Sequence, residues 1–80
     1  MEFVLIKRAF FDNDGNCCSE CNELIRKRDI LHIYEELPDS LCVCIEIIGS
    51  NGEKRTIHEY HGSQYLTRNR IYNLQEILNK

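Results

Sequence analysis

Two cysteines that are separated by two residues form the motif of this chain with the most direct chemical meaning. Cys18 and Cys21 lie in the segment GNCCSECNEL (residues 15–24), where a glycine-containing turn leads into a predicted helix. The first turn of a helix presents backbone N–H groups and the positive end of the helix dipole, and both favour a thiolate. Two helical positions three residues apart share a face, so the second thiol can reach the first. The motif therefore predicts a reversible disulfide, in which one cysteine attacks and the other resolves the mixed intermediate.

A second cysteine pair allows a different chemistry. Cys42 and Cys44 share one face of a predicted strand, and with Cys18 and Cys21 they could supply four thiolates to a tetrahedral zinc ion. A bound metal would stabilise a chain this short. The four sulfurs can meet only if residues 30–36 form a strand, because a continuous helix would place the two pairs at opposite edges of the sheet. Otherwise Cys42 and Cys44 fill the core as small apolar residues.

The remaining candidate thiols and ligands have less specific spacing. Cys17 could pair with Cys21 across four residues, whereas a disulfide between the adjacent residues 17 and 18 would strain the backbone. His58 and His61 have the HxxH spacing, but on the end of a strand these positions point to opposite faces. The sequence therefore predicts surface or partly packed histidines rather than a metal site.

Length, charge and cysteine number limit the class of protein. The 80 residues predict a single domain, 1–80, with a small core. The net charge of −3 argues against a broad nucleic-acid-binding surface, which would need a far more positive chain. Residues 1–11 carry Lys7 and Arg8 within their apolar stretch, which predicts neither a signal peptide nor a membrane span. We therefore expect a cytoplasmic protein whose five cysteines are redox-active, metal-bound or free.

The first half of the chain predicts a strand followed by a helix. Residues 2–10, EFVLIKRAF, are rich in β-branched and aromatic residues, and the turn formers of segment 11–16 follow them. Apolar residues then recur mostly at three- and four-residue steps over 19–37, before Pro38. Within this helix, residues 30–36 fit a strand equally well.

The second half predicts a hairpin and a closing helix. Residues 41–48, LCVCIEII, are apolar on both faces, which is typical of a strand in the interior of a sheet. The pair Asn51-Gly52 is the strongest short-range hairpin signal, and it leads to a more polar returning strand over 54–60. An amphipathic helix follows Gly62, with apolar positions Leu66, Ile71, Leu74, Ile77 and Leu78.

This order of elements predicts a compact βαββα sandwich of the α/β class. A helix between the first two strands implies a right-handed parallel crossover. The hairpin then adds an antiparallel strand, which gives a small mixed sheet with both helices packed on it.

The CxxC motif and the order of elements resemble the thioredoxin and glutaredoxin superfamily. Cys18 and Cys21 stand where such proteins carry their active-site cysteines, and EYHG (59–62) before a terminal helix is similar to the closing part of that fold. The resemblance implies that Cys18 is the nucleophile and Cys21 the resolving cysteine. The chain lacks the family's cis-proline, since its one proline is Pro38, and it carries Glu20 between the two cysteines.

These observations leave three functions open. The first is a small thiol–disulfide redox or redox-sensing protein that uses Cys18 and Cys21 on a protein thiol or disulfide substrate, without a cofactor. The second is an interaction module with zinc bound by Cys18, Cys21, Cys42 and Cys44. The third is an adaptor without chemistry, which binds a protein partner through a sheet edge or the last helix.

Overall fold

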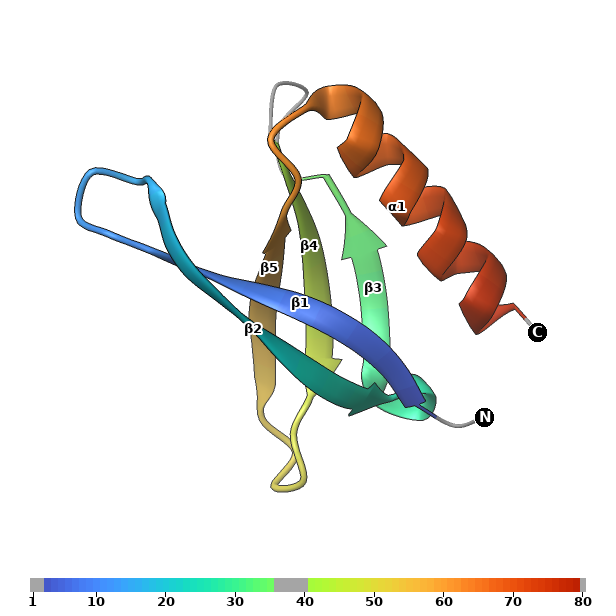
Figure 1. The fold of residues 1–80 in the computed structure, drawn as a ribbon. Helices are drawn as coiled ribbons and strands as arrows, with labels where there is room; N and C mark the ends of the chain where they lie inside the picture. The colour runs from blue at the N-terminus through green and yellow to red at the C-terminus, as the bar shows by residue number, and fades with distance from the viewer. Residues whose placement is uncertain (1–2, 36–40, 80) are drawn as a thin grey trace.

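The computed structural model describes residues 3–35 and 41–79 (Figure 1). Strands dominate this part of the chain, and an α-helix closes it. The elements are β1 (Phe3–Phe11), β2 (Cys17–Arg26), the short 3-10 helix η1 (Lys27–Asp29), β3 (Ile30–Tyr34), β4 (Cys42–Ile48), β5 (Lys54–Tyr60) and α1 (Gln64–Leu78).

The predicted βαββα thioredoxin-like sandwich is wrong. A helix was expected over 19–37, but residues 19–34 belong to β2, η1 and β3, and every strand pair among the described residues is antiparallel. For residues 30–36, the strand alternative holds over Ile30–Tyr34. The predicted helix end at Pro38 lies outside the described residues. Without a first helix there is no parallel crossover, and the superfamily's arrangement of elements is not present.

A tight turn joins β1 and β2 into a hairpin, whereas the sequence pattern predicted only a link from a strand to a helix. Gly15 has a φ of 83°, a left-handed conformation that glycine adopts without steric cost. The side chain of Asp12 accepts hydrogen bonds from the backbone N–H groups of Asp14 and Asn16, at 3.0 and 2.9 Å. Asp14-Gly15 is therefore itself a hairpin dipeptide. A register shift between Phe10 and Phe11 marks a bulge near the turn.

The second sheet has the order β3-β4-β5, with β4 in the centre. This confirms the interior strand predicted over 41–48 and the returning strand over 54–60. The turn between them uses Gly52, whose φ is 85° and whose N–H donates to the carbonyl of Gly49 at 2.9 Å. The Asn51-Gly52 signal is thus confirmed as a hairpin turn.

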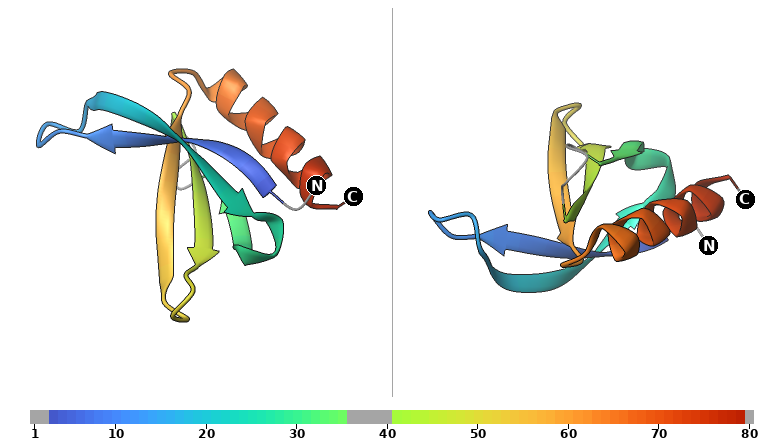
Figure 2. Two further views of the ribbon diagram at one scale, coloured as in Figure 1. Left: turned by 60° about the horizontal axis from the view of Figure 1, so that its bottom comes forward. Right: turned by 90° about the horizontal axis from the view of Figure 1, so that it is seen from above.

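The core lies between two layers. The β3-β4-β5 sheet forms one layer, and the β1-β2 hairpin lies across it with α1 beside the hairpin (Figure 2). The buried apolar residues come from every strand and from α1: Val4, Ile6, Ile25, Ile33, Val43, Ile45, Ile47, Ile57 and Leu74. Each such side chain contributes roughly 1.5–3 kcal/mol on burial. These contacts hold the hairpin on the sheet, although no strand ladder joins the two sheets.

The closing helix α1 is confirmed, and Ser63 is its N-cap. The Ser63 hydroxyl accepts a hydrogen bond from the N–H of Leu66 at 3.1 Å. Leu74 is fully buried against the sheet, whereas Leu66 is about half exposed (48%). No helix within residues 3–35 and 41–79 has the length and apolar character needed to cross a membrane.

Candidate functional site

Cys18 and Cys21 both lie in β2, so neither occupies the first turn of a helix. At about 3.3 Å per residue, the Cα atoms of two strand positions three apart lie roughly 10 Å from each other. The Cys18 thiol donates a hydrogen bond to the carbonyl oxygen of Phe10 at 3.3 Å, and both cysteines are exposed and free. A catalytic role for this pair stays a prediction, but the helix that was to activate the thiolate is not there.

The four proposed zinc ligands are not brought together. Cys42 and Cys44 lie in β4, beside Tyr60 and His58 of β5 in the sheet register, and Cys44 is buried. Across residues 3–35 and 41–79, no group of three or more histidine, cysteine, aspartate or glutamate side chains could hold a metal ion. Zinc binding required residues 30–36 to form a strand, and Ile30–Tyr34 do form one, but β2 pairs with β1 in a different sheet from β4. Burial of Cys44 agrees with the core-filling alternative.

Cys17 and the two histidines have separate surroundings. Cys17 lies at the bulge, and its thiol donates to the carbonyl oxygen of Ser19 at 3.7 Å. The His58 ring packs edge-on against Phe11, with ring centroids 6.2 Å apart. His61 contacts a carboxylate instead, and both histidines are partly buried. The HxxH spacing therefore forms no joint site.

Glu59 on β5 is a buried carboxylate with several hydrogen-bond partners, and the sequence pattern did not single it out. Its exposed fraction is 1%, and its carboxylate accepts hydrogen bonds from Nε (2.6 Å) and Nη2 (3.3 Å) of Arg70 on α1. It also accepts from the backbone N–H of Lys7 at 2.9 Å and lies 2.6 Å from Nε2 of His61. Arg70 Nη2 in turn donates to the carbonyl of Leu5 at 2.8 Å. Glu59 and Arg70 thus satisfy backbone groups on the edge of β1 that faces away from β2.

Opposing effects act on the Glu59 carboxyl. Burial alone would raise its pKa, because a buried carboxylate loses hydration. The hydrogen bonds from Arg70 and the Lys7 N–H, the charge of Arg70 and the hydrogen bond with His61 together outweigh burial. The pKa of Glu59 is therefore lowered, and the side chain is an anion that ties together β1, β5 and α1.

This lowered pKa predicts a loss of stability in acid. Below about pH 4.3 the unfolded chain binds a proton at Glu59 that the folded chain does not, so stability falls until the pH passes the folded pKa. We expect the NMR titration of the Glu59 side-chain carboxyl carbon to have a midpoint below the ordinary glutamate value of about 4.3. A midpoint for Glu59 at or above that ordinary value would contradict the hydrogen-bonded anion described here.

The outer edge of β2 is open. Lys7 lies opposite Asn22 in the hairpin register, yet the Lys7 N–H donates to Glu59 rather than to β2. Such a pair exchanges no hydrogen bonds, so the backbone groups of Asn22 also point away from β1. Because the direction of the backbone groups repeats every two residues along a strand, those of Glu20 and Leu24 also point away from β1. In the part of the chain that the structure describes, no strand lies beside these residues, which we call the open edge of β2.

Apolar side chains cover one face of the hairpin next to the open edge. Phe3 and Leu5 of β1 are two residues apart, and Leu5 lies directly opposite Leu24 of β2. Their exposed fractions are 46%, 53% and 66%, respectively. We call these three residues the outer apolar patch. Contiguous exposed apolar residues of this kind mark surfaces that contact other proteins.

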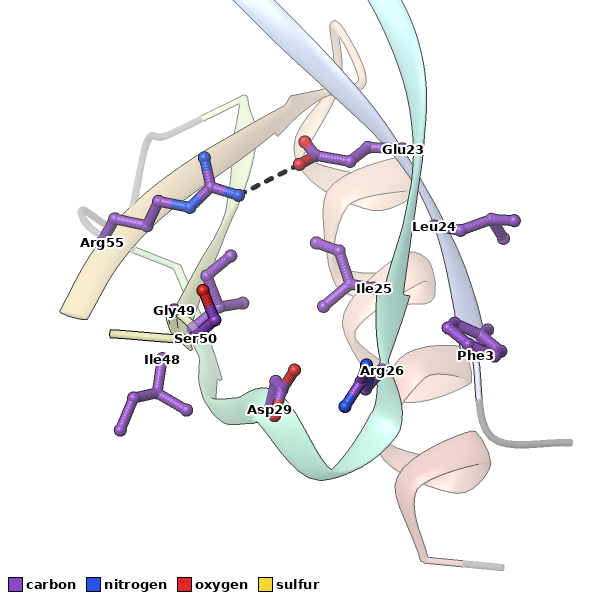
Figure 3. Close-up of a pocket in the computed structure, with 11 residues that line it drawn as sticks. Phe3, Glu23, Leu24, Ile25, Arg26, Asp29, Ile48, Gly49, Ser50 and Arg55 are labelled. Atoms are coloured by element: carbon purple, nitrogen blue, oxygen red, sulfur yellow. Dashed lines mark hydrogen bonds and ion pairs between the residues drawn. The ribbon is translucent and has the colours of Figure 1, made fainter. Parts of the chain in front are cut away.

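A groove of about 230 Å³ lies between β2 and the end of β4. Figure 3 shows Ile25 pointing into it from β2, with Ile48 on the opposite side. Glu23 and Arg55 bridge one end of the groove through a 3.1 Å hydrogen bond, and Asp29 lies toward the other end. We call this the edge groove. Isoleucine side chains line part of it and charged groups lie at its ends, with more polar than apolar surface exposed, so it can accept a side chain from a segment that lies along β2.

The comparisons with known proteins give no family for this chain. No protein-family model, no curated protein and no solved structure matches it. The resemblance to the thioredoxin and glutaredoxin superfamily thus gains no support from them.

Proposed function

We propose that the protein is an interaction module that binds an extended polypeptide segment along the open edge of β2. The observation that carries this proposal is the set of outward-pointing backbone groups of Glu20, Asn22 and Leu24 on a ten-residue strand. Strand addition supplies main-chain hydrogen bonds for affinity, and contacts to alternate side chains supply specificity. This is the adaptor function that the sequence left open, with the sheet edge as its binding surface.

The outer edge of β1 is covered by side chains, whereas the outer edge of β2 is not, and this difference supports a binding role for β2. Proteins commonly block exposed edges with short strands, prolines, bulges or covering elements, because open edges pair with other chains. On β1, the Glu59 carboxylate and Arg70 occupy the backbone groups of Lys7 and Leu5. On β2, the bulge lies at the start of the strand, and residues 19–26 contain no proline. One edge is closed and the other remains available.

Both faces beside the open edge can contribute to specificity. Successive side chains of an added strand point to alternate faces. One set would lie next to the outer apolar patch and the other next to the edge groove, where Glu23 and Arg55 form an ion pair. We therefore expect a preferred ligand to carry apolar residues at alternate positions.

Thiol–disulfide exchange through Cys18 and Cys21 stays a prediction without geometric support, and we do not propose it as the function. The cytoplasmic location also stays a prediction. A chain with five cysteines suits a reducing compartment, and strand addition at β2 does not require a thiol.

Two substitutions at one position test strand addition. Asn22→Pro removes an outward N–H from the open edge without removing a hydrogen bond between β1 and β2. Asn22→Ala keeps this N–H. Ten-residue peptides selected from a random library should shift the amide signals of residues 20–24 in NMR titrations. We expect Asn22→Pro to weaken their binding by about tenfold or more and Asn22→Ala to leave it nearly unchanged.

Two outcomes would contradict the proposal. One is a library that yields no peptide binding at residues 20–24 of the monomeric protein. The other is equal affinity of the Asn22→Pro and Asn22→Ala proteins for every selected peptide. Far-UV circular dichroism and thermal unfolding of both variants check that the hairpin still folds.

A further inference from the structure

We infer that the segment bound at the open edge of β2 is β2 of a second copy of the chain, paired antiparallel about Cys21. This inference rests on the proposed function and names its partner. The two copies would form a continuous four-stranded sheet in the order β1-β2-β2-β1. Because the Glu59 carboxylate and Arg70 occupy the other edge of the hairpin, the pairing closes as a symmetric dimer and does not extend into a fibre.

The side chains of β2 complement one another when the strand pairs with itself about Cys21. Glu20 then lies opposite the partner's Asn22, and both residues belong to the open edge, so their backbone groups can exchange hydrogen bonds. On the other face, Ser19 lies opposite the partner's Glu23. Each carboxylate is thus set against a side chain that can donate a hydrogen bond.

The two neighbouring symmetric registers are less favourable. A register centred on Glu20 would place the two Glu20 carboxylates directly opposite each other, and like charges in that position destabilise a sheet. A register centred on Asn22 would place Glu20 opposite the partner's Leu24, which sets a carboxylate against the most exposed leucine of the outer apolar patch. Charge and polarity therefore select the register about Cys21.

This register brings two identical thiols together and so provides a reporter. Cys21 is exposed, and as the central residue it would form a pair that exchanges no hydrogen bonds, with Cα atoms about 4.5 Å apart. That separation is within the range that a disulfide can span. A disulfide between the two Cys21 residues would therefore show that this register forms. The dimer itself depends on the backbone hydrogen bonds between the two β2 edges and not on the disulfide.

The first experiment measures the oligomeric state of the reduced protein by sedimentation velocity over a wide range of concentration. We expect a reversible monomer–dimer equilibrium. Asn22→Pro removes an N–H from each copy, so it should raise the dimer dissociation constant about tenfold or more, whereas Asn22→Ala should change it little. Equal dissociation constants for the two variants would overturn the inference.

The second experiment traps the dimer with oxidised glutathione. Two Cys21 thiols lose two electrons and two protons to form one disulfide, and the glutathione disulfide is reduced to two glutathione thiols. We expect a covalent dimer that Cys21→Ser abolishes and that Cys17→Ser and Cys18→Ser retain. A cross-link that survives Cys21→Ser, or no cross-link at concentrations where the dimer forms, would overturn the register.

The results separate this inference from the proposed function. A chain that stays monomeric at all concentrations but binds selected peptides at residues 20–24 would retain the proposed function and overturn the second copy as partner. A monomer that binds no peptide there would overturn both.

Discussion

Replacing Glu59 with glutamine should lower the free energy of unfolding by about 3 kcal/mol. Glutamine keeps the shape of the side chain but removes the charge that Arg70 contacts through two hydrogen bonds. It also replaces one acceptor oxygen with an NH₂ group, which would face the N–H of Lys7 or the guanidinium as a donor facing a donor. A buried ion pair that loses one partner leaves the other charge without compensation, and this accounts for the size of the effect.

Urea unfolding followed by circular dichroism checks this expectation, with Glu76→Gln as the matched control. Glu76 is an exposed glutamate on α1, so its substitution should change stability by less than about 0.5 kcal/mol. If Glu59→Gln costs no more than Glu76→Gln, the carboxylate does not hold β1, β5 and α1 together. Loss of this group would also free the backbone groups of β1 that Glu59 and Arg70 now occupy.

Local signals in the second half of the sequence were strong enough to predict its structure. The apolar run of β4, the Asn51-Gly52 turn and the capped amphipathic helix α1 each depend on neighbours within a few residues. β4 is apolar on both faces because it lies in the centre of its sheet, as the pattern indicated. These elements could be predicted because their sequence pattern and their environment agree.

The first half was mispredicted because one pattern fits two structures. Leu24 and Ile25 are adjacent, which suits the apolar stripe of a helix, but in β2 they point to opposite faces. Ile25 is buried in the core, whereas Leu24 is 66% exposed. An exposed leucine on a strand carries no sequence signal that separates it from a core leucine on a helix. The Asp14-Gly15 dipeptide was the available signal for a hairpin, and CxxC drew the interpretation toward a helix start instead.

The candidate site depends on contacts between residues that are distant in sequence. Glu59 meets the N–H of Lys7 across 52 positions, and its partner Arg70 lies on another element. In the sequence, Glu59 is one of 13 acidic residues, and only the fold distinguishes it from those at the surface. The open edge of β2 is likewise a property of the topology, because it exists only once β1 has paired on the other side.

Leu74→Ala should cost about 2–5 kcal/mol of stability, since it removes a fully buried side chain and leaves a cavity between α1 and the sheet. Alanine keeps the helix propensity, so the loss comes from packing rather than from the helix itself. An 80-residue domain has a small margin of stability, so this variant should unfold at a much lower urea concentration.

Tyr72→Ala is the matched control for Leu74→Ala on the same helix. Tyr72 is 70% exposed, so its loss should change stability by less than about 0.5 kcal/mol. Amide hydrogen exchange in Leu74→Ala distinguishes global destabilisation of the chain from local unfolding of α1. Faster exchange throughout the chain means that α1 belongs to the cooperative core, which we expect because Leu74 and Arg70 both hold the helix there. Faster exchange confined to residues 64–78 would show instead that the strands fold without the helix, and Glu59 would then need another partner for its charge.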